Sequence, residues 1–187
     1  MGFNLSGIVI NKNYKENIEF VEKEFDWNLE FIEEIAFEVA SENWKEEGLC
    51  DIYFSEHGTM IFLNMDMCID SWSTQNDNVL TFALSETSMA FNLEYCEKKE
   101  NLRSIMEVGG KKMSEEGDKL PVEETLSDIS EIIWEQIGIV LGKSFWKIAP
   151  EEKAYRYKLL KKENVVIEEI AVSAKPESSK KWWQFWK

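Results

Sequence analysis

The sequence predicts an α+β fold: a mainly antiparallel sheet, built as a meander, with helices from both ends of the chain packed on one face. Segments of alternating apolar and polar residues gather in the middle of the 187 residues, and segments with helical periodicity lie on either side. This order argues against a doubly wound parallel sheet, in which strands and helices alternate along the chain. With 44% hydrophobic residues, the chain can build one core without disulfides.

The first elements are a strand and a helix. Residues 3–10 alternate in the manner of a strand with at least one buried face. Asn13 and Glu16 are spaced as in a capping box, which predicts a helix start at this point. The apolar residues that follow at helical spacing are Tyr14, Ile18, Val21 and Phe25.

Residues 35–44 fit two structures. Ile35, Phe37 and Val39 alternate as in a strand, whereas Phe37, Ala40 and Trp44 share one face of a helix. We favour a helix that ends before Gly48, although the pattern leaves the choice between helix and strand open.

The middle of the chain predicts antiparallel strands. Residues 50–55 and 59–64 flank a turn at 56–58, where Gly58 is expected to need a positive φ. Residues 80–85, 89–95 and 102–108 then alternate, and the last of these runs into a glycine turn at 109–110. One-sided alternation of this kind predicts a sheet with one face packed on helices.

Two further helices are predicted after the sheet. Pro121 opens a turn, Asp128 and Glu131 can cap the main helix, and Gly142 ends it. Its apolar residues are Val122, Leu126, Ile129, Ile133, Ile137 and Val140. A second helix is expected from Pro150 in its first turn, with Ala154, Tyr157 and Leu160 on one side.

Composition divides the chain into three parts. Residues 1–162 form a single α+β domain, 163–181 an extended arm and linker, and 182–187 an aromatic and basic C-terminal motif. Within the linker, 173–181 contain no large apolar residue. The predicted partner-binding residues are Lys180, Lys181, Trp182, Trp183, Phe185 and Trp186.

This motif has three competing interpretations. Its rings can cover the chain's own domain or a symmetry mate, they can anchor a protein partner, or they can contact a membrane surface. Tryptophan is favoured at the centres of protein interfaces, and six residues are too few for membrane attachment alone. An oligomer is compatible with the first interpretation.

The net charge of −15 is uneven along the chain. Residues 1–97 carry 20 acidic and 4 basic side chains, whereas residues 98–187 carry 16 acidic and 17 basic ones. An acidic body repels a phosphate backbone and an anionic lipid surface, so we expect no nucleic-acid partner. We expect contact with a membrane surface only through the C-terminal motif, if at all.

Few residues suggest catalysis. His57 is the only histidine and falls in a predicted turn, and Cys50, Cys68 and Cys96 lack the spacing of a metal site, so neither metal nor cofactor is expected. Asn64, Asp66, Asp70 and Asp77 indicate an acidic surface loop. The strand carboxylates Glu86, Glu94 and Glu107 could pair for acid and base catalysis, but a solvated face is the simpler interpretation.

The compartment expected is the cytoplasm, because the first residues lack the pattern of a signal peptide and the cysteines are odd in number. In residues 50–63, 102–108 and 117–124, the chain resembles uncharacterised bacterial α+β domains. It is more weakly similar in size, acidity and layout to toxin-immunity-type proteins. This resemblance implies a cytoplasmic binding protein.

The sequence therefore favours a non-enzymatic cytoplasmic interaction protein, in which the tryptophan-rich motif docks a protein partner or its own domain. One alternative is an acidic immunity-type inhibitor of a basic toxin or nuclease. Another is a hydrolase-like enzyme that uses the strand carboxylates.

Overall fold

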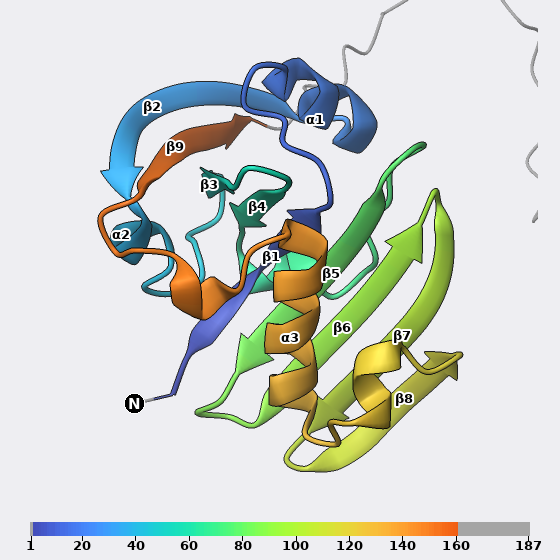
Figure 1. Ribbon diagram of the computed structural model, residues 1–187. Helices are drawn as coiled ribbons and strands as arrows, with labels where there is room; N and C mark the ends of the chain where they lie inside the picture. Colours follow the sequence, from blue (N-terminus) through green and yellow to red (C-terminus); the bar gives the residue numbers. More distant parts are fainter. Residues whose placement is uncertain (1, 161–187) are drawn as a thin grey trace, which may run out of the picture.

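The computed structural model describes residues 2–160, which form one antiparallel sheet of nine strands with helices packed against it (Figure 1). The α+β class is confirmed. The strands are β1 Asn4–Ile10, β2 Asn28–Ala36, β3 Leu49–Phe54, β4 Thr59–Phe62, β5 Asn78–Ser85, β6 Ala90–Glu97, β7 Glu100–Val108, β8 Lys111–Gly117 and β9 Lys153–Leu160. The helices are α1 Ile18–Phe25, α2 Phe37–Ala40 and α3 Ile129–Leu141, with short 3₁₀ helices η1 Met65–Cys68, η2 Pro121–Glu124 and η3 Phe145–Lys147.

The sheet has the strand order β2-β9-β3-β4-β1-β5-β6-β7-β8. The predicted meander is the half from β5 to β8, where each strand pairs with the next, and it includes β8 beyond the predicted strands (Figure 1). The predicted hairpin of residues 50–64 is the β3–β4 pair. Strand β1 joins the two halves, because it pairs with β4 on one side and β5 on the other.

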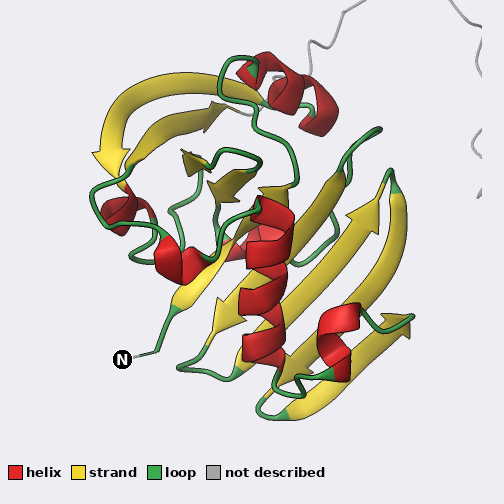
Figure 2. Ribbon diagram, in the orientation of Figure 1, coloured by secondary structure: helices red, strands yellow, loops and turns green. Residues whose placement is uncertain are grey.

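The helices are divided between the two faces of the sheet, in contrast to the expectation of one covered face. Leu5 and Val9 of β1 belong to the apolar cluster that contains α3. Ile8 and Ile10 belong to a second cluster, which contains Val21 and Phe25 of α1. Since neighbouring residues of a strand point to opposite faces, α1 and α3 lie on opposite sides. Figure 2 shows α3 crossing in front of the strands.

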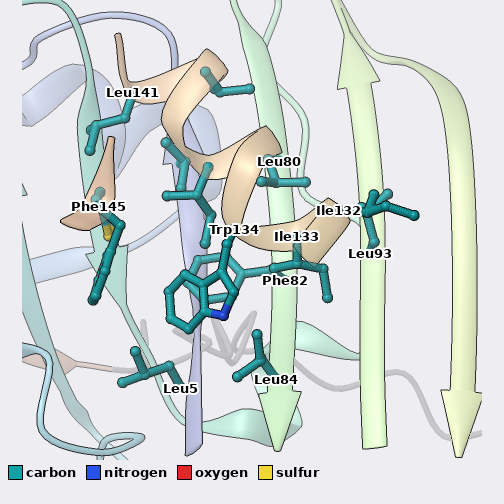
Figure 3. Close-up of a cluster of buried hydrophobic side chains, with 14 of the residues drawn as sticks. Leu5, Leu80, Phe82, Leu84, Leu93, Ile132, Ile133, Trp134, Leu141 and Phe145 are labelled. Atoms are coloured by element: carbon teal, nitrogen blue, oxygen red, sulfur yellow. The ribbon is translucent and has the colours of Figure 1, made fainter. Parts of the chain in front are cut away.

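Helix α3 follows the sequence signals closely. The Asp128 side chain accepts hydrogen bonds from the backbone N–H groups of Ser130 and Glu131, and Gly142 ends the helix in the left-handed conformation. Figure 3 shows Ile133 and Trp134 directed toward the sheet, near Phe82 and Leu84. Their burial against β1, β5 and β6 holds the helix in place.

Helix α1 begins later than predicted. Asn13 is not its cap, since the helix starts at Ile18 after Asn17. The Asn13 side chain instead donates to the Ser55 carbonyl at 2.6 Å and accepts from the Lys15 backbone N–H at 2.8 Å. It therefore fastens the segment before α1 to the β3–β4 turn.

Two predictions near the sheet edge need correction. Residues 35–44 contain the end of β2 and the single turn of α2, so the favoured helix is mostly wrong. The helix expected after Pro150 is wrong as well, because residues 153–160 form strand β9, which pairs with β2 on one side and β3 on the other. Pairing between distant segments outweighs local periodicity here.

Gly58 is required for close packing and not for a positive φ, which corrects the prediction. A Cβ at this position would lie 2.8 Å from the Leu141 Cα and carbonyl oxygen, and 2.9 Å from the Ile10 carbonyl oxygen. The nearby Ser55 hydroxyl donates to the same Leu141 carbonyl at 2.6 Å. The β3–β4 turn therefore touches the end of α3 through backbone atoms.

We predict that Gly58→Ala lowers the free energy of unfolding by about 1–3 kcal/mol, because backbone cannot move aside as a flexible side chain can. Gly138→Ala in α3 is the control, since its Cβ would meet Ser144 at an ordinary 3.4 Å and alanine favours the helix. Urea unfolding of both variants measures the difference. Equal stability of the two variants would contradict this explanation.

Glu152 joins α3 and β9 to the core. Its carboxylate accepts from Lys143 Nζ at 2.7 and 2.8 Å, from the Tyr53 hydroxyl at 2.7 Å and from the Ala149 backbone N–H at 2.9 Å. Burial raises the pKa of Glu152, but these hydrogen bonds and the Lys143 charge outweigh burial and lower the pKa to about 2. The ionised carboxylate is therefore favoured by folding.

The lowered pKa predicts a loss of stability in acid. A depressed folded-state pKa stabilises the protein above the unfolded pKa, and the contribution disappears as the pH falls from about 4.5 toward 2. Glu152→Gln should therefore show a shallower fall in unfolding free energy over this range than the unchanged protein. Urea unfolding at several pH values measures it, with Glu151→Gln at the exposed neighbouring position as control. Parallel pH profiles for Glu152→Gln and the unchanged protein would refute this role.

Candidate functional site

The predicted partner-binding residues lie outside the described part of the chain. These are Lys180, Lys181, Trp182, Trp183, Phe185 and Trp186, and the proposed linker at 163–181 lies outside it too. A site within residues 2–160 is therefore a surface that such a motif, or another ligand, could use.

His57 does not form a preorganised catalytic group. It lies in the turn between β3 and β4 with its side chain 68% exposed, and its Nε2 is 3.9 Å from Glu56 Oε2. A side chain this open to water is poorly fixed for proton transfer to a defined atom.

The three cysteines are buried free thiols. Burial raises the pKa of Cys50, and it raises the pKa of Cys68 to about 12, which keeps both thiols protonated and poorly nucleophilic. Among residues 2–160, no three His, Cys, Asp or Glu side chains are grouped as a metal site would require.

The strand carboxylates are not brought together. Glu94 lies on the face opposite α3 and accepts from the Ser104 hydroxyl at 2.6 Å. Glu107 lies on the α3 face, and Glu86 follows the end of β5, where it accepts from the Phe3 backbone N–H at 2.9 Å. A catalytic pair of these three side chains is therefore not formed.

The buried charges are matched within the fold. Arg103 donates to both oxygens of Glu123, at 2.8 and 2.6 Å, and to Glu115. Hydrogen bonds from Lys112 and then Arg103 lower the pKa of Glu115 to about 2. Asp51, fully buried, accepts two hydrogen bonds from Arg156. These ion pairs hold strands and loops together, and each of these charges is already paired within the fold.

An apolar pocket opens on the face opposite α3, which we call the Asn92 pocket. It has a volume of about 170 Å³ and lies between the η1 segment and strands β5, β6 and β7. Its lining residues are Met65, Asp66, Cys68, Ile69, Ala83, Ala90, Phe91, Asn92, Met106 and Val108. Ile69 and Val108 are about half exposed, so apolar surface continues from the pocket to its rim. Small-molecule sites measure roughly 300–1,000 Å³, and this volume suits a single side chain better.

Asn92 places one unpaired acceptor in this apolar wall. Its Nδ2 donates to the carbonyl oxygens of Cys68 at 2.9 Å and Ile69 at 3.1 Å, which fixes the orientation of the amide. Its Oδ1 is buried and accepts no hydrogen bond from any described residue. An isolated buried acceptor is unfavourable, and η1 would have to shift before a donor in the pocket could reach this enclosed oxygen.

The sequence pattern does not reveal this site. Asn92 stands at the polar position of an alternating strand, between Phe91 and Leu93, where a solvated residue is the ordinary expectation. The face is instead covered by η1, whose side chains Met65 and Met67 pack on the second apolar cluster. The small residues Ala83 and Ala90 opposite and before Asn92 are the one sequence signal of a hollow.

Comparison of the chain with protein-family models, curated proteins and solved structures finds no match. The resemblance to bacterial α+β domains and to toxin-immunity-type proteins therefore stays a prediction. Within residues 2–160, no helix has the length and apolar character needed to cross a membrane.

We predict that Asn92→Asp destabilises the fold. A carboxylate oxygen would replace the Nδ2 donor against two carbonyl oxygens, and unsatisfied groups of this kind lower the unfolding free energy by about 1–3 kcal/mol. Asn43→Asp is the control, because Asn43 is exposed and uses only its Oδ1 as acceptor toward Trp44 N–H. Urea unfolding at neutral pH compares the two, and equal losses would show that the Asn92 amide does not hold η1.

Proposed function

We propose that this chain is a non-enzymatic interaction protein whose C-terminal aromatic motif, residues 182–187, docks into the Asn92 pocket of its own domain. The unpaired Asn92 Oδ1 in an apolar pocket the size of one side chain carries this proposal. The indole of tryptophan combines a large apolar ring with an N–H that only donates. The motif supplies Trp182, Trp183 and Trp186.

The connection is long enough to reach the pocket. The twenty-two residue-to-residue steps from Leu160 to Trp182 span at most about 75 Å, several times the radius of a domain of this size. Leu159, near the end of β9, packs on the same apolar cluster as Cys68 of the pocket wall. The Leu159 side chain therefore points to the face where the Asn92 pocket opens, and β3, β4, β1 and β5 lie between β9 and the pocket strand β6.

Charge also favours docking of the C-terminal motif on its own domain. Residues 2–160 carry 32 acidic and 15 basic side chains, a net −17, whereas Lys180, Lys181 and Lys187 flank the rings. Asp66 lines the pocket, and Asp70 follows closely in the chain. Exposed pairs of this kind add little stability each, but together they orient the basic motif toward the acidic domain.

The proposal has two further parts, a role without catalysis and a cytoplasmic location. The buried, protonated thiols and the separated carboxylates support a role without catalysis. Three free cysteines fit a reducing compartment, which supports a cytoplasmic location.

Cys68 is fully buried in the described fold, so a thiol reagent labels it only when η1 opens locally, and docking of the motif should slow that opening. In the full chain, replacing Trp182, Trp183 and Trp186 by alanine should raise the rate at which a thiol reagent labels Cys68, by about tenfold for a docking free energy of about 1.4 kcal/mol. Mass spectrometry of the labelled peptides measures the rate for each cysteine. Cys50 on β3 lies outside the pocket and is the internal control, since its rate rises only if the whole domain loosens.

A second variant fills the pocket and leaves the motif intact. Ala90→Leu should also expose the motif, measured as faster hydrogen exchange of residues 182–187, whereas Ala36→Leu at the opposite edge of the sheet should not. An unchanged Cys68 rate in the triple alanine variant refutes docking on this pocket. Protection that grows with protein concentration would instead assign the motif to a second copy.

A second candidate function, the immunity-type inhibitor, is favoured by the charge of the described residues. Strand β2 at the sheet edge carries Glu30, Glu33 and Glu34 beside the exposed Phe31 and Ile32. Lys153 and Arg156 neutralise Glu34 and Glu33 in part. Association with a basic partner through this edge would weaken steeply with salt, unlike docking in an apolar pocket.

A further inference from the structure

Gln136 occupies a core position of α3 without a hydrogen-bond partner. It lies one helical turn from Ile132, Ile133 and Val140, which are all buried, and is itself only 4% exposed. An apolar side chain is the ordinary choice for such a position. Among residues 2–160, no group donates to or accepts from the Gln136 amide. The amide nitrogen and oxygen of Gln136 are not fully enclosed, so only solvent is left to satisfy them among residues 2–160.

The Gln136 side chain lines a pocket on the α3 face, the opposite face from the Asn92 pocket. This Gln136 pocket has a volume of about 490 Å³, within the range typical of small-molecule sites. Leu102, Leu120, Pro121 and Ile139 form its apolar walls. Ile139 is 57% exposed at the outer edge, so the pocket opens to solvent beside the helix.

A second polar group faces the same pocket from β6. The Tyr95 hydroxyl donates to Glu97 Oε1 at 2.9 Å and accepts from Asn78 Nδ2 at 3.1 Å. Burial, followed by the bond to Glu97, raises the pKa of Tyr95, so the hydroxyl stays protonated. Glu97 Oε2 has no partner among the described residues, which leaves it as an acceptor in the pocket wall.

The charges at the pocket disfavour an anionic ligand. Glu97 and the exposed Asp118 carry negative charge, and the exposed Lys119 carries the positive charge at the mouth. The described residues as a whole carry a net −17. A phosphate or carboxylate ligand would therefore be repelled, whereas a neutral compound with an N–H donor would not.

We propose that the Gln136 pocket binds a small, planar, uncharged compound that carries an amide or lactam group. The Gln136 side chain carries a carbonyl acceptor and an NH₂ group with two donors, and the carbonyl with one N–H complements the donor and acceptor edge of a second amide. The aliphatic walls from Leu102 and Pro121 cover a flat ring, and Glu97 Oε2 accepts a further N–H. This site is independent of the proposed docking of the C-terminal motif.

Two pairs of probes test the ligand class with the full chain. Nicotinamide and uracil carry the amide or lactam, and nicotinate and orotate are their carboxylate counterparts. We expect the two neutral probes to shift the NMR amide signals of residues 95–97 and 118–120 at millimolar concentration. The carboxylates should bind at least about tenfold more weakly, because the Glu97 and Asp118 charges oppose them.

The variant Gln136→Leu separates a binding role from a structural one. It should weaken binding of nicotinamide and uracil by at least about tenfold while raising the thermal midpoint of unfolding, because leucine has no amide to desolvate. Gln75→Leu, at an exposed loop position, should leave binding unchanged. The proposal is overturned if neither neutral probe binds, if binding survives Gln136→Leu, or if that variant lowers the midpoint.

Discussion

Burial of β1 on both faces is the constraint on which the rest of the structure depends. Ile8, Val9 and Ile10 are almost fully buried, and they divide between the two apolar clusters. At Gly7 the neighbouring strand comes so close that a Cβ would lie 2.2 Å from the Ile61 carbonyl oxygen. Because neither face of β1 is exposed to solvent, a separate element must pack against each face. Helix α3 supplies one cover, and α1 with η1 supplies the other.

Local signals predicted the elements that are stabilised locally. Asp128 and Gly142 mark the ends of α3, and the β3–β4 and β5–β7 segments alternate around short turns. Strand β9 could not be found in this way, since its two partners are β2 and β3, more than a hundred residues earlier in the chain. Ala154, Tyr157 and Leu160 fit a helical face equally well, and only the space between β2 and β3 decides for a strand.

The candidate sites were harder to predict than the fold, and for a related reason. Asn92 occupies the polar position of an alternating strand, and Gln136 lies next to Ile137 in an apolar helix. From sequence, Asn92 indicates a solvated face of the strand. Gln136 indicates the border between the apolar and polar faces of the helix. Their burial depends on η1 and on the loop before η2, whose positions the local pattern does not contain. The aromatic motif was evident from composition because it stands apart from any periodic segment.

Asn92 and Gln136 share one thermodynamic property. Each carries an amide group that no described residue satisfies in full, and the enclosed Asn92 Oδ1 alone costs about 1–3 kcal/mol, whereas domains of this size are stable by about 5–15 kcal/mol in total. A compound or segment that binds the folded chain and supplies the missing donor or acceptor removes part of that cost. Binding to the folded state alone also shifts the unfolding equilibrium by mass action. The two pockets lie on opposite faces of the sheet without shared residues, so their stabilising effects should add.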